Sequence, residues 1–287
     1  MLRRSFALAL VVCVIPGSAF AGKPTQYKFT SFDFPGATYT RGGDVNNNGT
    51  IVGYFNDAAG VPHGYVYDGG VFTQIDEPDA TAGTNAQGIN DAGTIVGRFD
   101  APFFDDAHGY VLSGGSFTPF DVPGATFTAA RGISPAGDVV GYYKDAAGVY
   151  HGFILSGGQF TWVDYPGTNF TALSGMNKFG QIVGQYHDAA GNDRGFLLSG
   201  GQFSSVNYPR AAWTRPQGIN AAGQIVGLYQ AADGSQHGFL LSGGAYTTID
   251  YPRASSSFIC GINDLGEIVG QWRDAAGNTH GYYAVKQ

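Results

Sequence analysis

The stretch HGFILSGGQFTWVDYP, residues 151–166, shows how the whole chain is organised, because near-copies of it return downstream. RGFLLSGGQFSSVNYP occupies residues 194–209, and HGFLLSGGAYTTIDYP occupies residues 237–252. Each copy starts 43 residues after the one before. A string that recurs at a fixed interval indicates a chain built from structural repeats.

Six copies of one unit fill residues 22–287 as a single domain. The His-Gly dipeptide, Arg-Gly in one copy, ends at Gly64, Gly109, Gly152, Gly195, Gly238 and Gly281. These glycines are 45 residues apart once and 43 residues apart four times. Every copy also has a Val-Gly pair, which ends at Gly53, Gly97, Gly141, Gly184, Gly227 and Gly270.

Each unit contains four short segments rich in β-branched and aromatic residues and bounded by turn residues, a pattern that indicates strands. In the third copy these segments are TAARGIS (128–134), DVVGYYK (138–144), YHGFIL (150–155) and QFTWVD (159–164). Four antiparallel strands repeated at this interval are typical of propeller blades. We therefore predict an all-β fold, a six-bladed β-propeller of four-stranded antiparallel blades.

The two ends of the chain complement each other. The last copy stops at HGYYAVKQ, residues 280–287, and lacks a fourth strand. Residues 28–35, KFTSFDFP, match the fourth-strand pattern QFTWVDYP. We expect the N-terminal strand to complete the last blade and close the ring, which would remove an exposed sheet edge.

The first 21 residues have the pattern of a bacterial-type secretory signal peptide. Arg3 and Arg4 precede an apolar run over residues 6–15, and small residues lead to Ala21. We therefore expect a secreted protein, either extracellular or periplasmic. The remaining chain keeps 13 Lys and Arg against 22 Asp and Glu, a net charge of −9, which disfavours a nucleic-acid partner. Nothing after the signal peptide is apolar enough to span a membrane.

The string GINDAGTIVG at residues 88–97, followed by His-Gly and an aromatic residue, resembles the bacterial extracellular HAF repeat family. That family is named after a His-Ala-Phe tripeptide, and this chain has Gly in the middle position of every copy. The resemblance covers residues 27–287. It implies a secreted repeat protein and leaves the activity open.

The hairpin between the third and fourth strands predicts five His-Asp pairs. Residues equally far from a two-residue turn face each other, and His151 and Asp164 are equally far from Gly157-Gly158. The same rule pairs His63 with Asp76, His108 with Asp121, His237 with Asp250 and, through ring closure, His280 with Asp33. One copy has Arg194 and Asn207 at these positions, so both partners change together.

The repetition of these pairs favours a structural role over a catalytic one. An enzyme needs one base at one centre, and no recurring Ser or Cys nucleophile accompanies the pairs. A shared axial metal does not fit, because the His lies on the third strand, ~10 Å outside the innermost one, whereas metal bonds are ~2 Å long. We expect neither a metal nor a cofactor.

The glycines of the Val-Gly and His-Gly pairs are expected to lie opposite each other. A four-residue loop, Asp145–Gly148, would place Gly141 opposite Gly152. Such a notch without side chains suits the close approach of an aromatic residue from the next blade.

Residues that differ among the copies are the candidates for binding, because variation on a uniform scaffold has no architectural role. They lie near the starts of the inner strands or in one lengthened loop: Arg41, Asn85, Arg131, Arg215, Phe103 and Phe104. Asp44 is a further candidate, since its column is Gly in the other five copies.

These features predict a monomeric binding or scaffold module for an extracellular glycan or protein. The alternative is a propeller enzyme, a lyase or hydrolase, that uses an arginine and Asp44 at the axial mouth. A deep axial pocket with converging carboxylates and arginines would favour the enzyme, and a shallow mouth would favour binding. The sequence leaves the question of catalysis open and favours binding.

Overall fold

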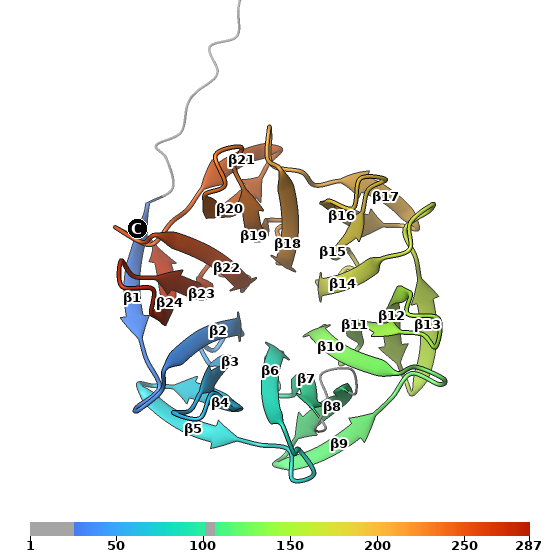
Figure 1. The fold of residues 1–287 in the computed structure, drawn as a ribbon, viewed down its shortest axis with the longest axis horizontal. Coiled ribbons are helices and arrows are strands. Elements are labelled where there is room, and N and C mark those ends of the chain that lie inside the picture. The colour runs from blue at the N-terminus through green and yellow to red at the C-terminus, as the bar shows by residue number, and fades with distance from the viewer. Residues whose placement is uncertain (1–25, 101–106) are drawn as a thin grey trace, which may run out of the picture.

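The computed structural model describes residues 26–100 and 107–287, which form 24 β-strands. The strands lie in sheets around a central axis, and the first full strand of each repeat lies nearest to that axis (Figure 1). The fold is an all-β propeller, as the sequence predicts. The predicted signal peptide, residues 1–21, lies outside the described residues. No helix in the described part of the chain is long and apolar enough to cross a membrane.

Four repeats form separate antiparallel sheets of four strands each. The first contains β6 (Gly83–Ile89), β7 (Ile95–Asp100), β8 (Ala107–Ser113) and β9 (Ser116–Phe120). The second contains β10 (Phe127–Ile133), β11 (Val139–Lys144), β12 (Tyr150–Ser156) and β13 (Gln159–Val163). The third contains β14 (Thr171–Met176), β15 (Ile182–His187), β16 (Asp193–Ser199) and β17 (Gln202–Ser205). The fourth contains β18 (Trp213–Ile219), β19 (Ile225–Gln230), β20 (Gln236–Ser242) and β21 (Ala245–Thr248).

The first and last repeats are joined in one eight-stranded sheet. It contains β1 (Tyr27–Phe32), β2 (Tyr39–Val45), β3 (Ile51–Asn56), β4 (Pro62–Asp68), β5 (Val71–Ile75), β22 (Ser256–Ile262), β23 (Ile268–Arg273) and β24 (Thr279–Lys286). One parallel pair, Tyr39 with Thr279, links its two halves. The sheets therefore differ from the six separate blades that the sequence predicts. Four repeats are separate sheets, and the first and last repeats share one sheet because the start of β2 lies close enough to β24 to add this pair.

The N-terminal strand β1 pairs antiparallel with β24, from Tyr27 opposite Lys286 to Phe32 opposite Gly281. This pairing is the one that the two chain ends predict. Phe32 is buried and stacks on Tyr67 of β4, with ring centroids 5.1 Å apart. The N-terminal strand therefore connects the last repeat to the first through main-chain pairing on one side and apolar packing on the other.

The hydrophobic core lies between neighbouring repeats. Its largest members are the aromatic residues that follow each His-Gly or Arg-Gly pair, and all of them have 0% exposure: Tyr65, Tyr110, Phe153, Phe196, Phe239 and Tyr282. Burial of one such side chain contributes roughly 1.5–3 kcal/mol. The recurring aromatic position of the sequence is therefore the main packing position of the fold.

The hairpin between the third and fourth strands has the predicted geometry. Gly157 and Gly158 have φ angles of 54° and 79°, which only glycine adopts without strain. Gly152 lies opposite Val163, as the symmetry of the turn requires. Register on this side of each sheet is thus set by a glycine pair that is visible in the sequence.

The register between the second and third strands differs from the expected one by one residue. Gly141 lies opposite Phe153, and Tyr142 lies opposite Gly152. The shift arises because Asp145 N donates to Val149 O at 3.0 Å, so the loop holds five residues instead of four. The ring of Phe153, from the same blade, therefore packs over Gly141, and Leu173 of the next repeat packs over Gly152.

A belt of buried asparagines connects the inner strands at the end of the axis where the tight turns lie. The side-chain amide of each donates to the backbone carbonyl of the equivalent residue in the next repeat. The bonds run from Asn46 to Asn90 (3.1 Å), Asn90 to Ser134 (3.4 Å), Asn177 to Asn220 (3.0 Å), Asn220 to Asn263 (3.0 Å) and Asn263 to Asn46 (3.0 Å). Ser134 is the sixth member and has no amide to donate, so the described belt is open only between Ser134 and Asn177.

We predict that Ser134→Asn closes the belt and stabilises the protein. The new amide would donate to Asn177 O, which accepts the Gly180 N–H at 3.0 Å and has a second lone pair. One buried hydrogen bond contributes about 1 kcal/mol, which corresponds to ~2–4 °C in melting temperature. Thermal unfolding measures the change. The reverse substitution, Asn220→Ser, should lower the melting temperature, and an unchanged or lower value for Ser134→Asn would contradict the role of the belt.

Candidate functional site

Two cavities lie at opposite ends of the axis. The wider one, about 330 Å³, lies where the inner strands begin and is lined by residues that include Arg41, Tyr142, Phe170, Arg215 and Phe258. The narrower one, about 90 Å³, lies among the tight turns that follow the inner strands. Small-molecule sites commonly start at ~300 Å³, so the wider cavity is the candidate binding site.

Side chains from one column of the inner strands separate the two cavities. Arg131, Ser174, Gln217 and Cys260 line both of them. Arg131 on β10 donates from Nη2 to Oε1 of Gln217 on β18 at 2.9 Å, across the position of β14. This hydrogen bond forms the floor of the wider cavity.

Arg215 is held in a fixed position at the wall of the wider cavity. Its Nε donates to Asp193 Oδ2 at 2.8 Å, and its Nη2 lies 2.6 Å from the same oxygen. The guanidinium also lies over the ring of Trp213, 4.7 Å from the centroid. Asp193 Oδ1 lies 3.3 Å from His187 Nε2. Charge-assisted hydrogen bonds and a cation–π contact together orient this arginine.

Aromatic rings and amides complete the wider cavity. Phe170 stacks on His187 with ring centroids 4.0 Å apart, and the Tyr39 hydroxyl donates to Gln271 Oε1 at 2.7 Å. Gln185 donates to Asp193 Oδ1 at 3.4 Å. The cavity therefore offers flat apolar faces beside hydrogen-bonding groups whose orientation is fixed before any ligand arrives.

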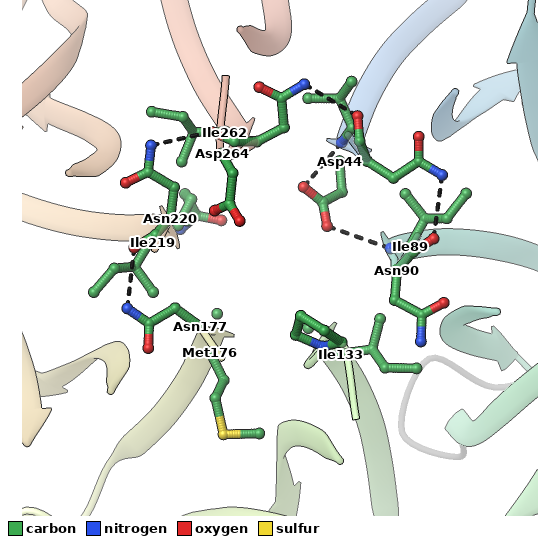
Figure 2. Close-up of a pocket in the computed structure, with 18 of the residues that line it drawn as sticks. Asp44, Ile89, Asn90, Ile133, Met176, Asn177, Ile219, Asn220, Ile262 and Asp264 are labelled. Carbon is green, nitrogen blue, oxygen red and sulfur yellow. Dashed lines mark hydrogen bonds between the residues drawn. The ribbon is translucent and has the colours of Figure 1, made fainter. Parts of the chain in front are cut away.

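Asp44 lines the narrower cavity, and Figure 2 shows its carboxyl group pointing into that cavity. The Asp44 oxygens accept from Val45 N at 2.9 Å and from Ile89 N at 3.3 Å. Burial raises the pKa of Asp44 to about 7, and the two backbone hydrogen bonds oppose that rise. Asp44 is thus an axial carboxyl group that changes its charge near neutral pH.

The predicted binding residues do not form one cluster. Arg41, Arg131 and Arg215 meet at the wider cavity, whereas Asp44 lies at the narrower one, with Arg131 between them. Asn85 is buried away from both cavities, and its carbonyl accepts from the Tyr110 hydroxyl at 3.3 Å. The predicted Phe103 and Phe104 lie outside the described residues.

Sequence analysis missed several residues that line the wider cavity, and four of them occupy one repeated position. These four follow the Val-Gly glycine directly, at the second strand of their repeats: Tyr142, Gln185, Leu228 and Gln271. This column holds a different kind of residue in most copies, as the column of Arg41 does. The same criterion of variation at a repeated position could therefore have found them.

All five predicted His-Asp pairs lie within hydrogen-bonding distance. The distances from His Nδ1 to a carboxylate oxygen are 3.0 Å for His63–Asp76, 2.8 Å for His108–Asp121, 3.0 Å for His151–Asp164, 2.7 Å for His237–Asp250 and 2.9 Å for His280–Asp33. These pairs lie at the outer strands of each repeat, away from the two axial cavities. We call each pair a clamp, a hydrogen bond between side chains that holds the third strand to the end of the fourth. Five such pairs spread around the ring suit this structural role better than a single reaction centre.

A second carboxylate approaches several of these histidines from the loop after the second strand. His151 Nε2 lies 3.5 Å from Asp145, and His280 Nε2 lies 3.5 Å from Asp274. The backbone hydrogen bond from Val149 is the main cause that lowers the pKa of Asp145, and the side-chain bond from Asn278 is the main cause that lowers the pKa of Asp274 to about 2. The loop aspartates thus cap their own loops and hold the imidazole from its other side.

The copy with Arg194 and Asn207 does not repeat the clamp. Arg194 Nε donates to Asp188 Oδ2 at 2.7 Å, on its own loop, while Asn207 accepts from Gly195 N at 3.0 Å and donates to Ser205 Oγ at 2.7 Å. The expected contact between the two is therefore absent, because the longer arginine side chain reaches the loop carboxylate instead.

Residues 26–100 and 107–287 contain no group of three His, Cys, Asp or Glu side chains arranged to hold a metal ion. The wider cavity likewise offers arginines, amides and aromatic rings, which are poor ligands for metals. Its chemistry suits an organic ligand.

Solved structures similar to this chain include two lectins and a bacterial protein. The SapL1 lectin, solved with α-methyl fucoside, has a TM-score of 0.58 at 15% identity, with 87% of this chain and 95% of the lectin covered. The fucose-specific lectin from Aleuria aurantia has a TM-score of 0.52 at 12% identity, over 90% and 91%. TolB from Acinetobacter baumannii has a TM-score of 0.58 at 12% identity, over 83% and 64%.

These low identities establish the propeller fold alone. No family model and no curated protein matches the chain, so the resemblance to HAF repeats stays a prediction.

We predict that the His151–Asp164 pair stabilises the fold. In a double-mutant cycle with His151→Ala and Asp164→Ala, thermal unfolding should give a coupling free energy of about 0.2–1 kcal/mol, the range for exposed ion pairs. The same cycle with Arg194→Ala and Asn207→Ala is the matched control and should give little coupling, since each side chain makes its hydrogen bonds to other partners. Zero coupling for His151–Asp164 would contradict the clamp.

Proposed function

We propose that this chain is a glycan-binding module and that the wider axial cavity is its binding site. The main observation behind this proposal is the set of residues that line the cavity. Aromatic faces lie beside amide and guanidinium groups, at a volume of about 330 Å³. Sugars present an apolar ring face and several hydroxyl groups, so both kinds of surface are needed to bind them. The similarity in fold to two lectins supports the same proposal.

Phe258 is the aromatic residue best placed to receive a sugar ring. Its side chain is half-buried, lines the wider cavity, and stacks on no other described aromatic ring. The amides of Gln217 and Gln271 line the same cavity and can donate to hydroxyl groups or accept from them. A ligand that stacks on Phe258 would therefore find polar partners nearby.

We further propose that the ring acts as six blades. The eight-stranded sheet divides at the single pair Tyr39–Thr279 into two units of four strands. An equivalent parallel bridge, Tyr150–Phe170, connects two repeats whose sheets are separate. One pair of this kind therefore marks close neighbours in a ring and does not merge them into one blade.

The cellular setting is part of the proposal. The signal-peptide pattern of residues 1–21 supports a location outside the cytoplasm, where the partner would be a glycan or a glycosylated protein. We propose that the module acts as a monomer. This setting also agrees with the resemblance to extracellular HAF repeats.

An enzyme remains the second candidate because of one observation, the raised pKa of Asp44 at the narrower cavity, which Arg131 also lines. A carboxyl group that titrates near pH 7 can act as a general acid or base. The 90 Å³ volume of that cavity and its separation from Arg41 and Arg215 weigh against a saccharide substrate there. Release of reducing ends from a glycan, lost in Asp44→Asn, would support the enzyme.

We predict that the protein binds glycans on an array and that Phe258→Ala weakens this binding about tenfold through loss of the stacking surface. Titration with the array's best-binding glycan measures the affinity. Phe179→Ala is the matched control, because Phe179 is 67% exposed on a turn at the opposite end of the axis. Absence of glycan binding, or equal affinity of Phe258→Ala and the parent protein, would refute the proposal.

A further inference from the structure

The wider cavity is positively charged within an acidic protein. The chain carries a formal net charge of −7, yet Arg41, Arg131 and Arg215 all line this cavity. Among the described residues that line it, none is Asp or Glu. A cavity with low-dielectric walls and charges of one sign concentrates the electric field inside it.

Arg41 has unused hydrogen-bonding capacity. Its Nε is buried and has no hydrogen-bond partner among the described residues. Its guanidinium lies over the Tyr54 ring at 5.7 Å from the centroid, and no described carboxylate pairs with it. A buried donor without a partner is costly, and more so when it belongs to a charged group. A ligand that supplies an acceptor to Arg41 would remove this cost.

Arg131 is a second cation of the cavity with which no described carboxylate pairs. The hydrogen bond to Gln217 engages one of its five N–H groups, and the partner is a neutral amide. Burial lowers the pKa of Arg131, and the positive charges of Arg41 and Arg98 act in the same direction. The group remains protonated at neutral pH, because arginine does not lose its proton in proteins. Its charge therefore stays uncompensated at the floor of the cavity.

Arg215 differs from these two, since Asp193 already neutralises it. Its position beside Trp213 makes it a rigid part of the wall, able to donate to a neutral group of a ligand. The excess positive charge of the cavity thus resides on Arg41 and Arg131.

We propose that the wider cavity binds a saccharide that carries an oxyanion, with Arg41 and Arg131 as the residues that contact the anionic group. The inference rests on the glycan-binding function proposed above and adds the chemical class of the sugar. A guanidinium binds a carboxylate or a sulfate ester through two parallel N–H groups. Uronic acids and sulfated sugars share this chemistry, and the rings of the cavity would pack against the rest of the sugar.

The first test compares ligands on the unchanged protein. An array carrying neutral, uronic-acid and sulfated oligosaccharides is followed by calorimetric titration of the best anionic glycan and of its neutral counterpart, the amide for a carboxylate or the desulfated sugar for a sulfate. The anionic form should bind ~10–100-fold more tightly, and the difference should shrink at high salt. The preferred array class identifies the oxyanion as a carboxylate or a sulfate.

The second test assigns the residues. Arg41→Gln and Arg131→Gln should each weaken binding of the anionic glycan by ~10–100-fold and should reduce the preference for the anionic glycan over its neutral counterpart by a similar factor. Arg273→Gln removes the same charge from the same face at an exposed residue outside the cavity, and should leave both affinities unchanged. Melting curves show whether each variant is folded. If a variant does not fold, the comparison of anionic and neutral glycans on the unchanged protein still tests the inference.

The outcomes separate this inference from the proposed function. Preference for neutral glycans would overturn the inference and leave the glycan-binding function standing. Anionic binding that neither Arg41→Gln nor Arg131→Gln weakens would also overturn it. Failure to bind any glycan, together with no binding of free galacturonate, would overturn both. Binding of free galacturonate without binding of any glycan would support an anion site and refute the glycan module.

Discussion

The antiparallel pairing of β1 with β24 is the interaction on which the rest of the structure depends. It supplies the outer strand that the last repeat lacks, and it connects residues at opposite ends of the chain, such as Phe32 and Gly281. The Trp272 indole donates to Ser31 Oγ at 2.9 Å, and His280 bonds to Asp33 across the same junction. Without this strand, the sheet edge at β24 would be exposed and the inner strands would no longer be held in a ring.

Closure matters for function because both cavities lie on the axis and take their walls from several repeats. The floor of the wider cavity is a contact between β10 and β18, and its wall includes residues of β2 and β22. No single repeat contains a site. A binding site of this kind exists only while the repeats keep their positions around the ring, which the asparagine belt and the interlocking aromatic residues secure.

Much of this architecture could be predicted because it is repeated. The glycine pair at each hairpin sets the register, so the His151–Asp164 contact followed from position alone. The matching chain ends predicted the pairing of β1 with β24. The strand pairing differs from the prediction at two places, and in both a local backbone contact is the cause. The capping bonds to Asp145 lengthen a loop by one residue and shift the register, and the pair Tyr39–Thr279 joins two repeats in one sheet.

The candidate site was less predictable for a physical reason. Variation among copies identified Arg41, Arg131 and Arg215. The contact of Arg131 with Gln217 joins β10 and β18, two repeats that are not neighbours in the ring, and has no signature in the sequence. Asp44 is the one residue with a side chain at a repeated position that holds Gly in the other five copies. The sequence did not show that this position lies at the narrower cavity, whereas Arg41 and Arg215 lie at the wider one.

Thermal unfolding of a chain that begins at Ala37, compared with one that begins at Gln26, tests ring closure most directly. The shorter chain lacks β1 and the buried Phe32. Loss of one buried phenylalanine alone costs about 3–5 kcal/mol, so the melting temperature should fall by more than ~6 °C. Equal melting temperatures for the two chains would show that the ring does not depend on its N-terminal strand.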